Sequence, residues 1–323
     1  MKLIYILYYY YKTTKLKIIK YITISILTIF IIMLNFVFKK IPIKVCLCTV
    51  AKLENKYILE FVEHYKKYNL DKIFLYDNND IDGEYFDNIL SAYIKSNFVE
   101  IINCRGENKI QIHKFQDCYI KNFKIYDWLL FYDIDEYIHL NKFHNIKNFL
   151  VQPKFNKCQS IFLNWIIHTD NNLIYYDKRK LYTRFTENVK IKNFCVGKTI
   201  IRGNIENLIF HSTHSLDLNI GRCDGFGHNF KIKEYIYCKI PDYKYFYIDH
   251  YYSKSTEEFI NKINRGSGLR GKDIKKKYAK IKLYFRFNKI TMEKIKFIAE
   301  KTHLNFSLLM YKLKKIKNYS LNR

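Results

Sequence analysis

The stretch Trp128–Leu140, WLLFYDIDEYIHL, decides how the rest of the chain is interpreted. Its apolar half ends at Tyr132 and is followed at once by the acidic residues Asp133, Asp135 and Glu136. In open α/β sheets, ligands bind beyond the carboxyl ends of the strands. Asp133 and Asp135 are two residues apart, so on extended backbone their side chains share a face. Two such carboxylates repel each other unless a cation lies between them, and the pattern predicts a site for Mg²⁺ or Mn²⁺. The alternative is a strand that runs into an acidic, solvated turn.

Alternating strands and helices precede this stretch. The sequence predicts strands over 43–50, 72–76 and 99–104, and helices over 55–68, 85–96 and 109–123. This alternation is typical of an open, mostly parallel α/β sheet flanked by helices and joined by right-handed crossovers. Each predicted strand ends in polar residues, so these ends lie along one edge of the sheet, where a nucleotide would bind. The chain has no G-x-G-x-x-G or Walker A sequence, which argues against dinucleotide enzymes and P-loop NTPases.

Charge and cysteine content exclude two classes of site. Lys and Arg number 56 against 30 Asp and Glu, a formal net charge of +26, but the lysines are scattered and form no basic stripe. We therefore predict no nucleic-acid partner. The eight cysteines include no C-x-x-C pair, which argues against structural zinc. Their even number permits disulfides without showing the pairing, and Cys46 and Cys48 are interpreted as core thiols in a buried strand.

The N-terminal region predicts a membrane anchor. Residues 21–38 contain 18 residues without a charge, close to the ~20 that span a bilayer as a helix. Lysines in the short tail, residues 1–20, favour a cytosolic N-terminus. The prediction is a single-pass type II protein that faces the lumen of the Golgi or endoplasmic reticulum. The alternative is a buried N-terminal helix.

At the C-terminal end of the chain, residues 269–323 are Lys-rich and amphipathic and are expected to form surface helices.

Several segments together resemble a known family. They lie at 48–55, 60–65, 73–79, 128–137 and 249–255, and the last precedes a predicted helix over 256–264. In this order and spacing they resemble family-2-type glycosyltransferases of the group allied to glycosyltransferase family 92. The resemblance covers a domain over 43–268. It implies a GT-A fold and a hexosyltransferase-like enzyme with a nucleotide-sugar donor, a divalent metal, and a glycan, glycoprotein or glycolipid as acceptor.

The resemblance also implies roles for residues at the predicted sheet edge. Thr49, Lys52 and Glu54 would line the pocket for the nucleotide base. Asp77 and Asn78 would hold the base or the ribose.

The metal site is implied in the same way. Asp133 would face the ribose and the metal, and Asp135 would ligate the metal directly. His250 would complete the metal shell, as a C-terminal His does in several GT-A enzymes; its alternative role is that of a half-buried structural histidine. A metal held there would neutralise the negative charge that develops on the departing diphosphate.

The acceptor side of the reaction is less defined by the sequence. Transfer with inversion requires a carboxylate base that takes the proton of the acceptor hydroxyl. Asp170 and Asp224 are the candidates, and each can also be read as an ordinary loop residue. Asp224 is slightly favoured, because it lies in the Gly-flanked segment 221–227, which could close over the site.

Two other function classes stay open from the sequence. A haloacid-dehalogenase-type phosphatase also ends an apolar strand in D-x-D, but there a Thr or Val usually follows where this chain has Tyr137, and the motif usually opens the domain. A membrane-tethered binding protein with a degenerate transferase fold is the non-enzymatic alternative. Intact Asp133 and Asp135 argue against it.

Overall fold

The computed structural model describes residues 12, 14–15, 20–21, 23–28, 42–189, 196–214, 220–229, 243–266 and 274–320. The chain divides into two compact units, Met1–Pro42 and Ile43–Arg323. Within the described residues, no helix is long and apolar enough to cross a membrane. Most of the predicted anchor, 21–38, lies outside the described residues, as does most of the tail over 1–20. The anchor therefore stays a prediction.

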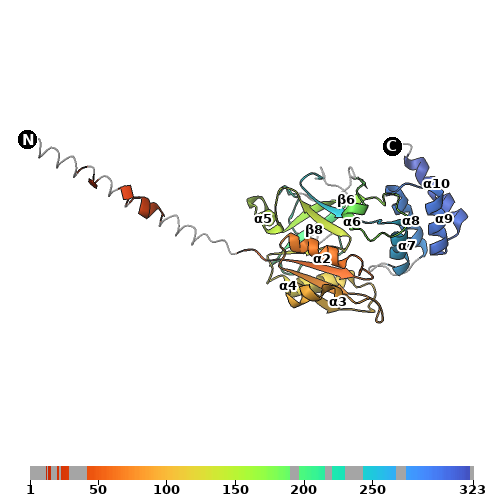
Figure 1. The fold of residues 1–323 in the computed structure, drawn as a ribbon, viewed down its shortest axis with the longest axis horizontal. Helices are drawn as coiled ribbons and strands as arrows, with labels where there is room; N and C mark the ends of the chain where they lie inside the picture. The colour runs from red at the N-terminus through yellow and green to blue at the C-terminus, as the bar shows by residue number, and fades with distance from the viewer. Residues whose placement is uncertain are drawn as a thin grey trace, which may run out of the picture. The chain divides into compact units, whose positions relative to one another are not determined.

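The first half of the sheet has the predicted alternation of strands and helices (Figure 1). The strands run in the order β3-β2-β1-β4, and each neighbouring pair is parallel. The elements are β1 (Val45–Ala51), α2 (Ile58–Lys67), β2 (Lys72–Asp77), α3 (Asp87–Lys95), β3 (Val99–Asn103), α4 (Gln111–Asn122) and β4 (Trp128–Phe131). The predicted α/β fold is confirmed over this region.

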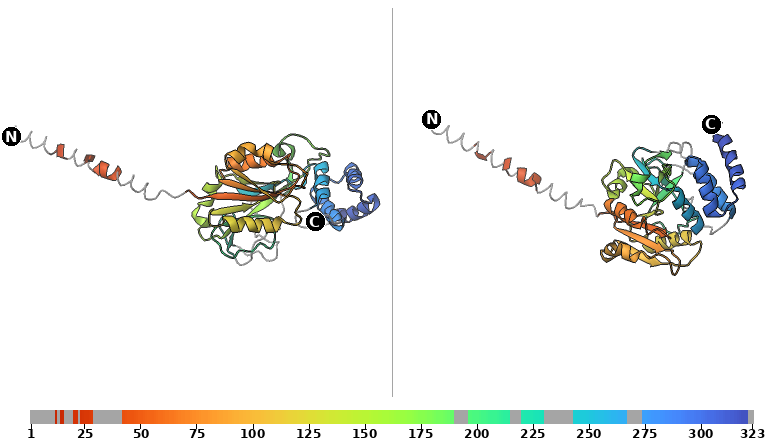
Figure 2. Two further views of the ribbon diagram at one scale, coloured as in Figure 1. Left: turned by 90° about the horizontal axis from the view of Figure 1, so that it is seen from below. Right: turned by 45° about the vertical axis from the view of Figure 1, so that its right-hand side comes forward.

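Both faces of β1, β2 and β4 are buried, which explains their continuous apolar runs, whereas the edge strand β3 exposes Glu100 and Asn103. In β1, Val45 and Leu47 pack in one core cluster, whereas Cys46 and Cys48 pack in another. Helices α2 and α3 contribute to the first cluster and α4 to the second, so the helices lie on opposite faces of the sheet (Figure 2, left).

The second half of the sheet contains antiparallel pairs, and its strands β5 and β8 were not expected from the sequence, whereas β6 and β10 fall on the expected strand segments 160–167 and 243–248. Its order is β4-β8-β6-β10-β5, with the short strands β7 and β9 paired to β6. Strand β8 is antiparallel to β4 and β6, and β10 is parallel to β6 but antiparallel to β5. The elements are β5 (Glu136–Leu140), β6 (Ser160–His168), β7 (Asn188–Val189), β8 (Gly197–Arg202), β9 (Arg222–Cys223) and β10 (Phe246–His250), with the short helices α5 (Ile146–Leu150), η1 (Pro153–Phe155) and α6 (Leu181–Arg184).

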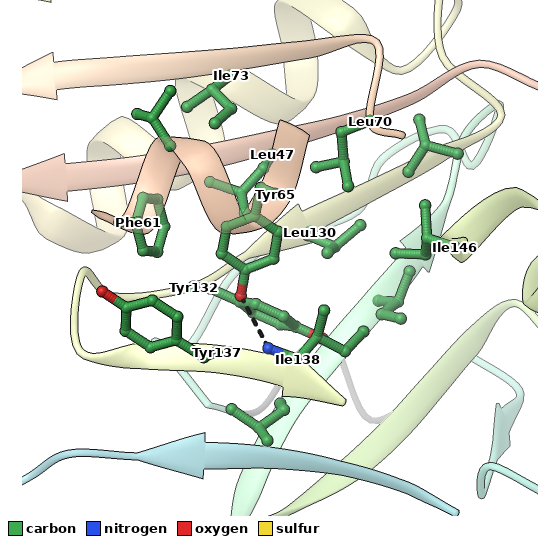
Figure 3. Close-up of a cluster of buried hydrophobic side chains, with 14 of the residues drawn as sticks. Leu47, Phe61, Tyr65, Leu70, Ile73, Leu130, Tyr132, Tyr137, Ile138 and Ile146 are labelled. Atoms are coloured by element: carbon green, nitrogen blue, oxygen red, sulfur yellow. Dashed lines mark hydrogen bonds between the residues drawn. The ribbon is translucent and has the colours of Figure 1, made fainter. Parts of the chain in front are cut away.

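Helix α2 fixes the start of β5 directly behind the acidic motif. The Tyr65 hydroxyl donates to the Glu136 carbonyl at 2.8 Å and accepts from the Ile138 amide at 3.3 Å (Figure 3). Phe61, on the same helix, meets the Tyr137 ring edge-on at 5.9 Å between centroids. These contacts satisfy backbone groups of β5 inside the core, and buried backbone groups of this kind require partners. The turn that carries the carboxylates is therefore anchored on its C-terminal side.

The last four helices pack on one another within the same compact unit as the sheet. They are α7 (Thr256–Arg265), α8 (Ile274–Phe287), α9 (Met292–Thr302) and α10 (Phe306–Ser320). Ser255 caps α7 in a reciprocal capping box with Glu258. Phe259 of α7 stacks on Tyr284 of α8 at 4.3 Å between ring centroids. The amphipathic helices expected in the C-terminal region are therefore present, and their apolar faces pack together with α7.

Two disulfides cross-link the sheet to neighbouring segments. Cys48 of β1 is bonded to Cys118 of α4, and Cys158 is bonded to Cys223 of β9. The interpretation of Cys48 as a free core thiol was therefore wrong, whereas Cys46 is free and buried as expected. The partner of Cys48 lies 70 residues away and meets it only once α4 packs on the sheet.

Candidate active site

A cavity of about 1110 Å³ opens at the carboxyl ends of β1, β2 and β4. This is the predicted ligand edge of the sheet. One part of its wall comes from the loops after the parallel strands and includes Lys52, Glu54, Asn78, Glu107 and Gln111. The opposite part comes from β6 and the C-terminal helices and includes Trp165, Ile167, Lys262, Arg265, Lys280 and Phe287. Asp133, Asp135 and His250 line the same cavity.

The acidic motif lies in a tight turn. Strand β4 ends at Phe131, β5 begins at Glu136, and the Glu136 amide donates to the Asp133 carbonyl at 3.0 Å. The two carboxylates were expected to share a face because the backbone would be extended, and that reason was wrong. The turn achieves the same result, because Asp133 and Asp135 both line the cavity.

Asp133 is held by polar contacts from two other elements. Its carboxylate accepts from the Lys198 Nζ of β8 at 3.0 Å and from the Gln111 Nε2 of α4 at 2.5 Å. Burial is the largest influence on the pKa of Asp133 and raises it, but the charge and the hydrogen bond of Lys198, with smaller contributions, together lower it. Lys198 is fully buried and also lies 3.4 Å from the Glu136 carboxylate, whose pKa is raised by burial. Asp133 is therefore ionised at neutral pH.

Asp135 faces a lysine and a histidine. The Lys262 Nζ of α7 donates to its Oδ2 at 2.5 Å, and the His250 Nε2 lies 3.7 Å from its Oδ1. Burial is the largest influence on Asp135 and opposes its ionisation, but Lys262 and the other nearby cationic groups together overcome it and hold the pKa well below its usual range. Both carboxylates of the motif are thus ionised side by side, as a cation site requires.

His250 is a buried, neutral imidazole in this cavity. Its ring centroid lies 4.2 Å from that of Trp165, and its Nδ1 is buried with no hydrogen-bond partner among the described residues. Burial lowers the pKa of His250 to about 4. His214 meets Trp165 edge-on, with 5.0 Å between the ring centroids. A neutral imidazole with a free nitrogen is a competent metal ligand.

The chemistry of this donor set fits a divalent cation. Asp133 and Asp135 supply ionised oxygen ligands and His250 supplies an unprotonated nitrogen, a combination that suits Mn²⁺. Across the residues that the structure describes, however, no three His, Cys, Asp or Glu side chains are grouped closely enough to hold an ion. The assignment of these three residues to a metal therefore belongs to the proposal below.

The predicted nucleotide-binding residues divide into two groups. Lys52, Glu54 and Asn78 line the cavity, and Asn78 also donates to the carbonyls of Cys104 and Glu107. Lys52 pairs with Asp80 at 2.6 Å. Glu54 pairs with Arg265 at 2.7 Å and with Lys254 at 3.3 Å, and these cations lower its pKa against the effect of burial.

Thr49 and Asp77 are not part of the cavity wall formed by the described residues. Thr49 is fully buried within β1. The Asp77 carboxylate accepts from Arg105 at 2.7 Å and from the Asn79 amide at 2.9 Å, so it organises the loop after β2. Thr49 and Asp77 were predicted to contact the nucleotide, but strand alternation turns their side chains away from the cavity. Their roles are therefore to support the strand and the loop that follows.

Asp170 is not brought to the cavity. It is 1% exposed, and its carboxylate lies 2.7 Å from the Lys294 Nζ of α9 and accepts a hydrogen bond from Tyr284 of α8. Its backbone amide donates to the Asn288 Oδ1 at 2.6 Å. This predicted base instead fastens the C-terminal helices to the end of β6, because those helices cover it.

Asp224 lies at the other end of β6. It follows β9, which pairs with Ser160 and Ile161 at the start of β6, whereas the cavity is lined by Trp165 and Ile167 near its end. Its carboxylate accepts from the Phe226 and His228 amides, each at 2.9 Å, and so closes a surface turn. The predicted Gly-flanked lid is this turn, and it does not reach the cavity.

The sequence analysis missed the two lysines that contact the acidic pair. Lys198 and Lys262 contact Asp133 and Asp135 from 65 and 127 residues away along the chain. One local signal was available: Lys262 and Arg265 are three residues apart on a capped helix and therefore share a face.

The profile of glycosyltransferase family 92 matches residues 41–294, which include the acidic turn, His250, α7 and α8. The chain belongs to glycosyltransferase family 92. A family 92 protein of Ricinus communis is 26% identical over 99 residues, 31% of this chain and 18% of the relative. A family 92 protein of Oryza sativa subsp. japonica is 23% identical over 119 residues, 36% and 20% of the two chains. The matched segments thus span about a fifth of these curated relatives.

Solved glycosyltransferase structures show weak similarity to this family 92 chain. GalNAc-T7 with UDP, GalNAc and Mn²⁺ has a TM-score of 0.30 and 19% identity, over 40% of this chain and 23% of its own. S. aureus TarS 1–349 has a TM-score of 0.37 and 11% identity, over 84% and 69% of the two chains.

Proposed function

We propose that this cavity transfers a sugar from a nucleotide-sugar donor to a glycan, glycoprotein or glycolipid acceptor. The observation that carries the proposal is the pair Asp133 and Asp135, both ionised in a cavity at the carboxyl ends of the parallel strands. Two features of this family 92 chain support the proposal. The cavity is large enough for a nucleotide, and its charged residues lie where the diphosphate leaving group would be bound.

Each wall of the cavity has a distinct task in this proposal. Lys52, Glu54 and Asn78 bind the nucleotide, and they lie on the loops after β1 and β2. On the facing wall, Trp165 and Phe287 offer apolar ring surface against which the sugar or the acceptor can lie. The cavity excludes bulk water from the anomeric carbon once the donor fills it, which limits hydrolysis.

The leaving group is the second task. Asp133, Asp135 and His250 would hold Mn²⁺ or Mg²⁺, which when bound supplies Lewis-acid neutralisation of the diphosphate. Lys262 keeps Asp135 ionised and ready to ligate, since its ammonium donates to that carboxylate. Lys198 does the same for Asp133. With Asp170 and Asp224 away from the cavity, inversion would need a base from another residue.

The cellular setting is part of the proposal. Disulfides persist in oxidising compartments and are rare in the cytosol. The bonds Cys48–Cys118 and Cys158–Cys223 agree with a lumenal domain, and the apolar segment 21–38 would supply the membrane anchor of a type II protein.

Replacement of Asp135 by Asn tests the proposal. Asp135→Asn should lower the rate of sugar transfer by roughly 10²–10³-fold, because it removes one of two charges at the leaving group. Asp82→Asn, at an exposed position, is the matched control and should transfer at the wild-type rate. Turnover of Asp135→Asn at the wild-type level, with Mn²⁺ titrated, would contradict the assignment. Nucleotide-sugar binding without transfer by the wild-type protein would favour the binding-protein alternative.

A further inference from the structure

Helix α8 forms one wall of the cavity, although it lies beyond the domain predicted from the sequence. Lys280, Leu283 and Phe287 line the cavity at helical spacing. Both ends of the helix are fixed. Near its start, the Lys277 Nζ donates to the Asn264 Oδ1 of α7 at 3.2 Å, and directly after its end, Asn288 donates to the Ser253 Oγ at 2.8 Å. Lys280, one turn after Lys277, is therefore on the side of α8 that faces α7.

Four cations of α7 and α8 line the cavity, and three of them, Lys262, Arg265 and Lys280, lie close enough to repel one another, while Arg286 is the fourth. Lys262 and Arg265 of α7 each have a carboxylate partner, Asp135 at 2.5 Å and Glu54 at 2.7 Å. Lys280 has neither an ion pair nor a hydrogen bond within the part of the chain that the structure describes. Burial, together with the charges of Lys262 and Arg265, lowers the pKa of Lys280 to about 8.

This arrangement is unfavourable unless an anion enters. A partly buried ammonium beside two other cations loses hydration and is repelled by its neighbours. A polyanion placed among the three would remove both penalties at once. The position of these cations indicates which anion binds. Lys262 contacts Asp135, the carboxylate proposed to act at the leaving group, so the anion is expected to be the leaving group itself.

We propose that Lys280 is a ligand of the donor diphosphate, and that with Lys262 and Arg265 it forms a cationic clamp between α7 and α8. This inference rests on the proposed function and adds a catalytic residue to it, since Lys280 would touch the leaving group. Charge accumulates on the diphosphate as the bond to the sugar breaks, so a cation fixed there lowers the barrier. Helix α8 thereby becomes part of the donor site.

The test uses inorganic pyrophosphate, which carries the diphosphate charge without a base or a sugar. Calorimetric titration into the full chain, with and without Mg²⁺, should show an affinity that falls roughly 10-fold or more in Lys280→Met, as expected for the loss of one charge-assisted contact. Lys280→Arg keeps the charge and should stay within about 3-fold of wild type. Lys282→Met, an exposed lysine of the same helix, is the matched control and should bind as wild type.

The outcomes separate this inference from the proposed function. Equal pyrophosphate affinity in wild type and Lys280→Met, or no binding by wild type, overturns the clamp even if sugar transfer is observed. Selective loss in Lys280→Met with rescue by Lys280→Arg supports it, even if no nucleotide sugar proves to be a donor. Lys280→Gln serves as a second neutral variant, and a melting curve equal to that of wild type shows for each variant that the loss is not one of folding.

Discussion

Replacement of Asp170 tests whether its carboxylate has a structural role or acts as the catalytic base. Asp170 and Lys294 are each 1% exposed and lie 2.7 Å apart. Removal of one member of a buried ion pair typically costs 3–5 kcal/mol, because the other charge is left without a partner. In Asp170→Asn, Lys294 keeps weak contacts with the Asn172 side chain at 3.3 Å and the Lys289 carbonyl at 3.4 Å. We therefore expect the lower end of the range, about 3 kcal/mol of unfolding free energy.

The assay is urea unfolding of Asp170→Asn, Lys294→Met and the double variant Asp170→Asn/Lys294→Met, in which the amide side chain introduced at position 170 can still accept from the Asn172 amide. The double variant removes both charges and should cost less than either single change. Turnover per folded molecule should stay within a few-fold of wild type in Asp170→Asn, since the carboxylate does not line the cavity. Wild-type stability combined with a roughly 10²-fold loss of kcat would refute this reasoning and return Asp170 to the role of a base.

Two further predictions concern groups away from the cavity. Asp224→Asn should keep the wild-type kcat and KM in a transfer assay, because Asp224 only closes a surface turn; a 10²-fold loss of kcat would restore it as the base. The His64 imidazole contacts the Ile138 carbonyl at 2.9 Å, and burial beside His139 lowers the pKa of His64 to about 4. The unfolded chain binds this proton near pH 6.5 and the folded chain does not, so stability should fall between pH 6.5 and 4, by at most about 3 kcal/mol. Denaturant titrations of wild type and His64→Gln should show a shallower fall in the variant, and parallel curves would contradict it.

The local part of the fold could be predicted because its signals are local. Strands β1, β2 and β4 are buried on both faces and form apolar runs in the sequence, and α2 shows its core face at helical spacing. Strand β5 was missed because it begins at Glu136, inside the acidic motif. Strand β8 was missed because it carries Lys198, whose burial is explained by its contacts with Asp133 and Glu136. Neither signal is visible in a short window of sequence.

The residues of the site that directly follow a strand could be predicted from the sequence. Lys52, Asn78, Asp133 and Asp135 follow β1, β2 and β4, and the parallel order of these strands brings them to one cavity. Asp170 also follows a strand, but Asn288, 118 residues later, and the helices around it decide that it is covered. Long-range packing of this kind is not encoded in any local pattern.

The disulfide pairing and the role of the C-terminal helices could not be predicted for the same physical reason, which is that both depend on long-range packing. Cys48 and Cys118 are 70 residues apart and meet only through the packing of α4 on β1. Lys280 stands in a Lys-rich stretch that resembles a solvated helix, and only the contact of α8 with α7 shows that it faces the cavity.

The release of nucleoside diphosphate from a panel of nucleotide sugars tests the central claim most directly. The wild-type chain should release diphosphate from at least one donor, faster with an acceptor glycan present, and Asp135→Asn should release it at a rate lower by roughly 10²–10³-fold. Equal release by wild type and Asp135→Asn, or no release from any donor with or without Mn²⁺, would contradict the claim that this cavity is the active site of a sugar transferase.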